Sequence, residues 1–388
     1  MKFILIAGEP SGDRLGAALM VGLKALLPQV RFEGVGGPAM QAEGLESAFP
    51  MEELSVMGIA EVLPKYFHLK RRIRECADLV LVEKPAALIT IDSPDFCLRV
   101  ARIVKEAAPE IPTVHYVAPS VWAWRPGRAA KMAGVIDHVL ALLPFEPPYM
   151  EAAGMSCDFT GHPVVAEPVA SAADAAAFRA AHGIAGNAPL LAVLPGSRRG
   201  EVTRLLPPFG ETVAGLSAAL PGLRVVLPTP AHLADVVTGE LAGWAGAPVI
   251  LKSPDVANRT AAFAAADAAL AASGTVSLEL AAQACPMVIA YDMAPLTLWL
   301  MRRMIRIDTV TLVNLVSETR TVPEFIGKDC RAGTLVPALR RLMAGETAGQ
   351  AEAMQVTMDR LGRGGEAPGR RAARSVLAFL QVAAQDLR

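Results

Sequence analysis

The sequence predicts an α/β protein with two Rossmann-like domains, and three observations support this. Short apolar runs, typical of strands buried on both faces of a parallel sheet, alternate with amphipathic segments of helical period. Turns rich in Gly, Pro, Ser and Asp follow several of these runs. The pattern begins at residues 3–7 and begins again at residues 190–194. The length of 388 residues agrees, because domains contain ~150 residues.

The composition narrows the class of protein. A net charge of −1 with 53% hydrophobic residues indicates a globular protein without a general attraction for nucleic acid. Five scattered cysteines form no C-x-x-C pair, so we expect a reducing compartment, no disulfide framework and no metal site. The first apolar run is too short for a signal peptide, and no run approaches the ~18 residues of a spanning helix. We expect a cytoplasmic protein, with association at a membrane surface left open.

In the first domain, a strand at residues 3–7, a turn at 8–13, a helix at 15–27 and a strand at 32–35 begin a βαβ unit. Their glycines do not follow G-x-G-x-x-G, so the dinucleotide fingerprint is absent. A strand at residues 87–91 leads into Asp92 and Asp95, where ligands of open α/β sheets collect. A carboxylate there can act as a general base or cap the next helix. We expect one residue in each role, with Asp92, the first off the strand, as the candidate base.

A cluster of polar and aromatic residues accompanies the end of the next strand, which begins at Pro112. Its members are His115, Ser120, Trp122, Trp124 and Arg125, followed by Arg128 and Lys131. Indole rings and cations at a strand end favour a ligand site. Indoles that cap the core beside solvated cations would give the same pattern. A further strand and loop follow at residues 139–146.

The second domain follows an alanine-rich connector at residues 166–187. A strand at residues 190–194 leads to a Gly-Ser-Arg turn, in which Arg198 can hold a phosphate at two points. No G-K-[ST] follows, which argues against an ATPase. A helix from Glu201 is expected to be disturbed soon by Pro207 and Pro208. Further strands are predicted at residues 223–227, 249–251, 268–271 and 286–291.

A second turn of this domain favours a nucleotide site. Ser273, Gly274 and Thr275 follow a strand and precede a helix, so their N–H groups and hydroxyls can bind a diphosphate. Glu279 lies about one turn into that helix, where its carboxylate can accept a ribose hydroxyl. Simple N-capping by Ser273 and Thr275 is the other interpretation.

Two segments combine large apolar side chains with clustered cations, at residues 57–76 and 297–306. Either could be an ordinary helix with a solvated end. The presence of two favours binding at an anionic membrane surface, because apolar insertion and headgroup attraction add. The side chains expected to enter the headgroup boundary are Phe67, Leu69, Trp299 and Leu300. Residues 364–388 predict a basic turn and a helix.

The chain also resembles the lipid-A-disaccharide synthase family in segments spread over nearly its whole length. These are AGEPSGDRLGA, GVGGPAMQAEG, ELSVMGIAEVL, IDSPDF, HYVAPSVWAWRPGR, LPFE, GHP, LPGSRRGEV and ASGTVSLELA. The two βαβ halves, and this resemblance, imply two Rossmann-like domains facing across a cleft, the GT-B layout. We expect an acceptor-binding, membrane-associating domain at residues 1–165, a UDP-sugar donor domain at 166–363, and a C-terminal helix at 364–388. Whether that helix returns to the first domain is left open.

The resemblance implies an inverting glycosyltransferase. It would move 2,3-diacylglucosamine from UDP to the 6-hydroxyl of 2,3-diacylglucosamine 1-phosphate, giving lipid A disaccharide 1-phosphate and UDP. UDP-diacylglucosamine is then a substrate, and no cofactor is expected. The expected partners are the two lipid substrates and an anionic membrane, on the inner face of the inner membrane, while a homodimer is left open. A UDP-sugar epimerase of the same layout and a non-catalytic membrane-surface binder are the alternatives.

The resemblance also implies residue roles. Asp92 would be the base and Arg198 a diphosphate clamp, and the acceptor cleft would hold Asp95 with the 115–125 cluster. The remaining substrate or donor contacts would be Ser11, Ser273, Gly274, Thr275, Glu279 and Asn314. Three positions depart from the family pattern and bear on donor binding, namely Asp292, Val313 and Gly327.

Overall fold

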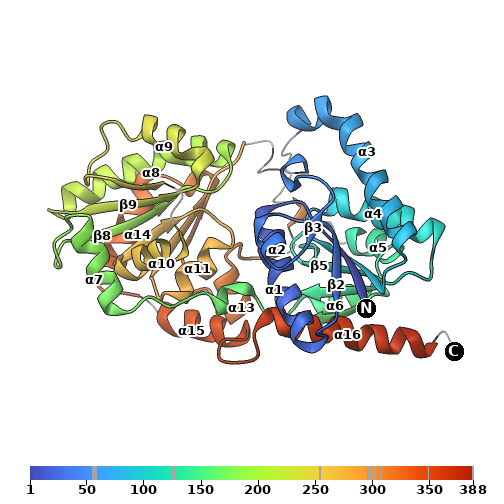
Figure 1. Ribbon diagram of the computed structural model, residues 1–388. Coiled ribbons are helices and arrows are strands. Elements are labelled where there is room, and N and C mark those ends of the chain that lie inside the picture. The colour runs from blue at the N-terminus through green and yellow to red at the C-terminus, as the bar shows by residue number, and fades with distance from the viewer. Residues whose placement is uncertain are drawn as a thin grey trace. The chain divides into compact units, whose positions relative to one another are not determined.

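The computed structural model describes residues 1–54, 59–124, 127–252, 255–294, 297, 299, 303–305, 307–347 and 349–386. The chain forms two compact units. The first contains Met1–Pro163 together with Gly364–Arg388, and the second contains Val164–Arg363. Each unit is built on one parallel β-sheet flanked by helices (Figure 1). The predicted fold class, two parallel α/β domains, is therefore confirmed.

The sheet of the first unit has seven strands in the order β3-β2-β1-β4-β5-β6-β7. Its strands are β1 (Lys2–Ala7), β2 (Arg31–Val35), β3 (Glu46–Ser47), β4 (Ala87–Ile91), β5 (Thr113–Tyr116), β6 (His138–Ala141) and β7 (Ser156–Phe159). Its helices are α1 (Pro10–Leu26), α2 (Pro38–Ala42), α3 (Ile59–Glu83), α4 (Pro94–Ala107), α5 (Gly127–Ala133), α6 (Pro147–Glu151) and α16 (Pro368–Asp386). Because the chain leaves β1 toward β2 and returns beside β1 with β4, the strand order reverses between β1 and β4.

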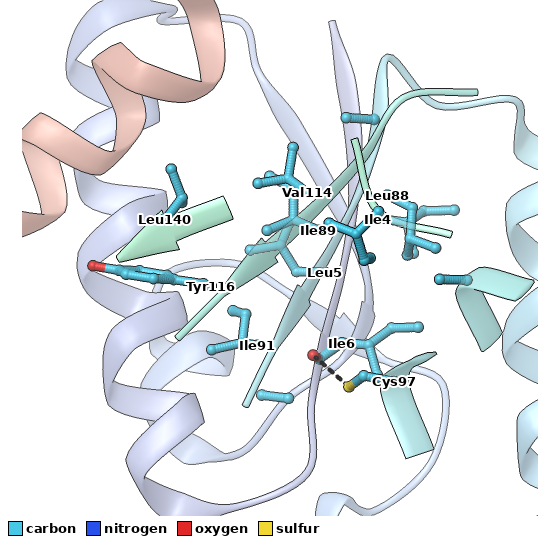
Figure 2. Packing of buried hydrophobic residues seen from close by; sticks show 14 of the residues in the cluster. Ile4, Leu5, Ile6, Leu88, Ile89, Ile91, Cys97, Val114, Tyr116 and Leu140 are labelled. Carbon is cyan, nitrogen blue, oxygen red and sulfur yellow. Dashed lines mark hydrogen bonds between the residues drawn. The ribbon is translucent and has the colours of Figure 1, made fainter. Parts of the chain in front are cut away.

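The central strands of this sheet are buried on both faces, as their continuous apolar sequences predict. Ile4, Leu5 and Ile6 of β1 are at most 1% exposed. Figure 2 shows them beside Leu88, Ile89 and Ile91 of β4 and Val114 and Tyr116 of β5. Burying each Leu or Ile side chain contributes about 1.5–3 kcal/mol, so this layer dominates the stability of the unit.

The C-terminal helix α16 belongs to the first unit, which settles the point that the sequence left open. It packs against α1 and places Ala372, Ala373 and Val376 in the first core (Figure 1). Contacts with His138 of β6 fix its position. The ring of His138 stacks on the ring of Phe379, with 4.9 Å between the two ring centroids. The same ring is hydrogen-bonded to Ser375 Oγ at 2.8 Å through Nε2.

The sheet of the second unit has six parallel strands in the order β10-β9-β8-β11-β12-β13. Its strands are β8 (Leu190–Leu194), β9 (Arg224–Thr229), β10 (Val249–Lys252), β11 (Ala268–Ala271), β12 (Met287–Tyr291) and β13 (Glu324–Ile326). Its helices are α7 (Ala172–Ala181), α8 (Arg199–Ala219), α9 (Ala234–Glu240), α10 (Val256–Ala265), α11 (Val276–Ala282), α13 (Leu312–Ser317), α14 (Ala332–Met343) and α15 (Gln350–Arg360). The strand order reverses here between β8 and β11.

Two elements of this unit differ from the sequence prediction. The expected connector contains α7, whose start is fixed by a capping box between Ser171 and Asp174. Helix α8 continues through Pro207 and Pro208 instead of ending there. Its buried face, which includes Leu205, Phe209 and Val213, offsets the ~3 kcal/mol that each interior proline costs.

Candidate active site

In the first unit, the loops that follow β1 and β4 meet where the strand order reverses, the position at which open α/β sheets bind ligands. The two loops approach closely. A Cβ added to Gly8, after β1, would lie 2.7 Å from Ser93 Oγ, after β4. A glycine is therefore required at position 8 unless Ser93 moves, and the first turn of α1 is held beside the end of β4.

Asp92 lies at this point, partly exposed, in a left-handed backbone conformation with φ +53°. Ser93 also has a positive φ, +43°. Two such residues in sequence cost about 1–3 kcal/mol each, and strain of this kind is concentrated at functional sites. The carboxylate accepts a hydrogen bond from the Ser93 N–H at 2.9 Å through Oδ1, and its Oδ2 lies 3.4 Å from Ser11 Oγ. The arrangement presents one carboxylate oxygen and one hydroxyl at the open edge of the sheet.

Asp95 occupies a different place. It is exposed in the first turn of α4, whose N-cap is Ser93, and that cap has no side-chain hydrogen bond. Its charge suits the positive end of the helix. Of the two aspartates, Asp95 therefore stabilises the start of α4 through its charge and without a capping hydrogen bond. Asp92 is the carboxylate at the point where the strand order reverses.

His115 is not at the strand end, which corrects its prediction as an acceptor-cleft residue. It is 1% exposed within β5, and its Nδ1 lies 2.8 Å from Thr90 Oγ1 of the neighbouring strand. Burial lowers the pKa of His115 to about 4, because the charged imidazolium would be desolvated. It is a neutral core histidine in this structure.

The indoles do lie beyond β5, at the same edge of the sheet. Trp122 donates its Nε1–H to Glu146 Oε1 at 3.2 Å and packs edge-on against Phe145. The guanidinium of Arg128 lies 6.0 Å from the ring of Trp124. Ser120 is exposed in the turn between β5 and the indoles, whereas Arg125 lies outside the described residues.

Glu146 is a site candidate that the sequence reasoning missed. It follows β6, is 4% exposed, and accepts the N–H groups of Leu142 and Leu143 at 3.1 and 2.9 Å in addition to the indole of Trp122. Burial raises the pKa of Glu146 to about 7. The signal was available, because a carboxylate just after a buried strand is the pattern that selected Asp92. Perturbed carboxylates at a strand edge favour function.

In the second unit, a pocket of about 530 Å³ opens at the switch point between β8 and β11. Five of the predicted donor residues line it, namely Arg198, Ser273, Gly274, Thr275 and Glu279. The structure thus brings together two turns that are far apart in sequence. Both belong to strand ends, as the sequence predicted.

The first of these turns carries Arg198. Gly196, in the same turn, has φ +114°, a backbone conformation that favours glycine. A Cβ at this position would also lie only 2.8 Å from Glu201 Oε2. The side chain of Arg198 is 67% exposed and its Nη1 lies 3.4 Å from Glu201 Oε1. Glu201 is itself fixed by the hydroxyl of Tyr291 at 3.0 Å. An exposed guanidinium with one loose partner can turn toward an anionic ligand.

The second turn carries Ser273 and Thr275. The hydroxyl of Ser273 donates to the carbonyl of Val310 at 3.0 Å, and Thr275 is the N-cap of α11 without a side-chain cap bond. Capping by these hydroxyls, the alternative interpretation, is therefore absent in the described structure. Glu279 pairs with Arg259, whose Nε lies 2.9 Å from Oε2. Arg259 also lines the pocket, and the sequence reasoning missed it.

Asn314, the remaining donor contact predicted in this unit, is not among the residues that line this pocket. It is 1% exposed, and its amide bonds both the N–H and the carbonyl of Val322 at 3.0 and 2.9 Å. Glu324 accepts from the N–H groups of Val310 and Thr311 nearby. This buried network holds the 309–311 segment, whose Val310 carbonyl receives the Ser273 hydroxyl.

The three residues that depart from the family pattern, Asp292, Val313 and Gly327, also lie in the second unit. Asp292 Oδ2 lies 3.5 Å from Arg204 Nη1. Val313 is fully buried in α13, and Gly327 has φ +66° immediately after β13. None of the three is among the residues that line the pocket.

The two basic-apolar segments are only partly described. In α3, Phe67 is 82% exposed, whereas Leu69 is partly buried and packs against the first core. Trp299 is 53% exposed, with the guanidinium of Arg303 3.5 Å from its ring centroid. Leu300 lies outside the described residues. In the described part of the chain, no helix has the length and apolar character needed to cross a bilayer.

Two parallel α/β units with polar turns at their switch points agree with the GT-B fold, a class that contains glycosyltransferases and sugar-nucleotide epimerases. The model of the lipid-A-disaccharide synthetase family matches residues 3–376. The chain belongs to this family and is an enzyme of glycosyl transfer.

Named relatives agree with this assignment. Lipid-A-disaccharide synthase of Ruegeria pomeroyi is 62% identical over 97% of this chain and 95% of its own. The enzyme of Rhodospirillum centenum is 50% identical over 97% and 94%.

Solved structures share the fold alone. UDP-GlcNAc 2-epimerase from Neisseria meningitidis, bound to UDP-GlcNAc, has a TM-score of 0.67 at 12% identity over 98% of this chain and all of its own. Sucrose-phosphate synthase from Thermosynechococcus elongatus has a TM-score of 0.61 at 13% identity over 99% of this chain and all of its own. Since the epimerase likeness is of fold only and the sequence relatives are synthases, the family assignment favours transfer over epimerisation.

Proposed function

We propose that this enzyme transfers 2,3-diacylglucosamine from UDP to the 6-hydroxyl of 2,3-diacylglucosamine 1-phosphate. The products are lipid A disaccharide 1-phosphate and UDP. The observation that carries the proposal is the pocket of the second unit, in which Arg198, Ser273, Thr275 and Glu279 converge at a strand switch point. This set offers a cation and hydroxyls for a diphosphate and a carboxylate for ribose hydroxyls. Membership of the lipid-A-disaccharide synthetase family supports it.

In the proposed reaction, the acceptor's 6-hydroxyl oxygen attacks the anomeric carbon as the bond from that carbon to the UDP oxygen breaks. Attack from the face opposite UDP inverts the anomeric centre and gives a β linkage. Asp92 takes the hydroxyl proton, and Ser11 steadies its Oδ2. Arg198 neutralises charge that develops on the leaving diphosphate. We propose that no cofactor takes part, with Arg198 meeting the charge on the diphosphate and the UDP-sugar serving as a substrate.

The substrates carry acyl chains, so we also propose that the enzyme binds at the inner face of the inner membrane. Phe67, Lys70 and Arg74 follow an i, i+3, i+7 spacing and are exposed on α3. Neither of these two cations forms an ion pair with a described residue, in contrast to Arg72, which pairs with Glu53 and Glu75. Each unpaired cation near an anionic surface is worth about 1 kcal/mol.

The proposed function is tested by incubating the purified enzyme with UDP-2,3-diacylglucosamine and 2,3-diacylglucosamine 1-phosphate in mixed micelles. Equal amounts of UDP and a β-linked disaccharide 1-phosphate are expected, with neither formed when the acceptor is left out. An epimerised UDP-sugar without disaccharide would overturn the proposal in favour of an epimerase. Binding to micelles without turnover of either substrate would favour the non-catalytic alternative.

A further inference from the structure

The donor pocket is tied to the segment that enters the second unit. This segment contains η2 (Pro163–Ala166) and continues through Glu167 to Ser171, before α7 begins. Glu167 Oε2 lies 3.3 Å from Nη2 of Arg259, and the Nε of the same guanidinium lies 2.9 Å from Glu279 Oε2. One guanidinium therefore donates hydrogen bonds to a carboxylate of the entering segment and forms an ion pair with a carboxylate of the pocket, although its Nε–H does not point at that carboxylate as a hydrogen bond requires.

A second connection joins the same two parts of the chain. Gln283, at the C-terminal end of α11, donates to the carbonyl of Pro168 at 3.0 Å and accepts the N–H of Ala170 at 2.9 Å. Gln283 is buried, so these bonds are protected from water. Helix α11, which carries Glu279, is thus fixed to the entering segment at its end as well as in its middle.

The charges favour a positioning role for Arg259 over a direct phosphate contact. Its side chain is 20% exposed and faces two carboxylates, so its positive charge is already compensated. Arg198 is the opposite case, exposed and loosely paired with one carboxylate. A guanidinium is a rigid planar cation, so Arg259, fixed by Glu167, attracts the Glu279 carboxylate and limits where it can lie.

We propose that Arg259 is a positioning residue that orients Glu279 for the ribose hydroxyls of a uridine diphosphate, and that Glu167 holds Arg259 in place. The inference rests on the proposed function, in which the pocket binds the UDP part of the donor. Glu167 is not among the residues that line the pocket, yet it becomes a determinant of nucleotide recognition. Nucleotide binding and the conformation of the entering segment are then coupled, each affecting the other by the same factor.

The test compares UDP with 2′,3′-dideoxy-UDP by calorimetry, because the second ligand lacks the hydroxyls that Glu279 would accept. The wild-type enzyme is expected to bind UDP about 10–100-fold more tightly, the usual share of hydrogen bonds to a charged group. In Arg259→Gln and Glu167→Gln this preference is expected to fall to a few-fold, with dideoxy-UDP affinity nearly unchanged. Arg259→Lys should restore part of the preference. Glu211→Gln, an exposed site on α8, is the matched control.

The outcomes separate the inference from the function on which it rests. An equal loss of affinity for both ligands in Arg259→Gln would make Arg259 a diphosphate contact and overturn the inference. An unchanged preference in Glu167→Gln would overturn the role of the entering segment, and this variant decides the case if Arg259→Gln fails to fold. A wild-type enzyme that binds neither ligand would instead overturn the proposed function itself.

Discussion

The hydroxyl of Ser11, in the first turn of α1, lies 3.4 Å from Oδ2 of Asp92, which follows β4 81 positions later in the chain. The contact exists because β1 and β4 are neighbours in the sheet, so the loops after both strands share one edge. The other carboxylate oxygen of Asp92 is occupied by a backbone N–H. One oxygen is therefore fixed by the main chain, and the other faces the hydroxyl of Ser11 at the open edge of the sheet.

Asp92→Asn is expected to keep the fold and UDP binding and to lower turnover about 10²–10⁴-fold, the usual contribution of a general base. The amide has the same shape but cannot take a proton. Turnover is measured as release of UDP on micellar substrates, with Glu106→Gln as the control, because Glu106 is an exposed carboxylate of α4 outside the predicted site. Near-normal turnover in folded Asp92→Asn would refute the assignment.

Arg198→Ala is expected to weaken UDP binding about 10–100-fold, because a charge-assisted hydrogen bond contributes about 1.5–3 kcal/mol. Calorimetry with UDP measures this directly. Arg199→Ala is the control, since Arg199 is an exposed arginine of the same turn that does not line the pocket. Equal affinities for the two variants would show that Arg198 is a surface residue.

Glu146→Gln is expected to change how stability depends on pH. The pKa of Glu146 is raised to about 7 in the folded enzyme, above the value of about 4.3 of an unfolded glutamate. As pH rises from about 4.3 to 7, the unfolded chain releases this proton and the folded one keeps it, so folding is destabilised across that window. The shift corresponds to about 3–4 kcal/mol. Glutamine has no proton to release, so the variant should gain stability relative to wild type between pH 4.5 and 7.5.

Urea unfolding at several pH values measures that difference. The variant should be the less stable protein at pH 4.5, because its amide cannot accept from both Trp122 and the two N–H groups that Glu146 binds. A difference in stability that stays constant with pH would mean that the pKa of Glu146 is not raised.

Phe67→Ser is expected to lower binding to anionic vesicles about tenfold while leaving UDP binding unchanged. The apolar ring would enter the headgroup boundary beside Lys70 and Arg74, and removing it loses part of the ~1.5–3 kcal/mol of a buried aromatic side chain. Val82→Ser on the same helix is the matched control, because Val82 is also exposed, at 77%. Salt should weaken wild-type binding, since charges are screened over about 8 Å at physiological ionic strength. If the wild-type enzyme does not co-sediment with such vesicles at low salt, this surface does not bind membranes.

The sequence predicts strand ends well and side-chain direction less well. Asp92 and the two pocket turns were found because their position follows from a buried apolar run and the turn after it. His115 belongs to the same sequence cluster as the residues beyond β5, but it lies within β5 and faces Thr90, which the sequence pattern does not reveal. Asn314 was assigned by resemblance, and its role depends on Val322 and Thr309, which pair with it only in the folded unit. Arg259 and Glu167 have no local signal at all, since only the tertiary structure brings them to Glu279.

The return of α16 to the first unit has a consequence for biosynthesis. A ribosome adds about 5–20 residues per second, so the strands of the first unit emerge tens of seconds before the helix that packs on α1 and contributes Ala372, Ala373 and Val376 to their core. The second unit is continuous in sequence and is synthesised within that interval. Until α16 is made, the first unit would leave exposed the apolar surface that α16 covers. A premature stop codon just before Gly364 would therefore damage the N-terminal unit, although every strand of its sheet had been made.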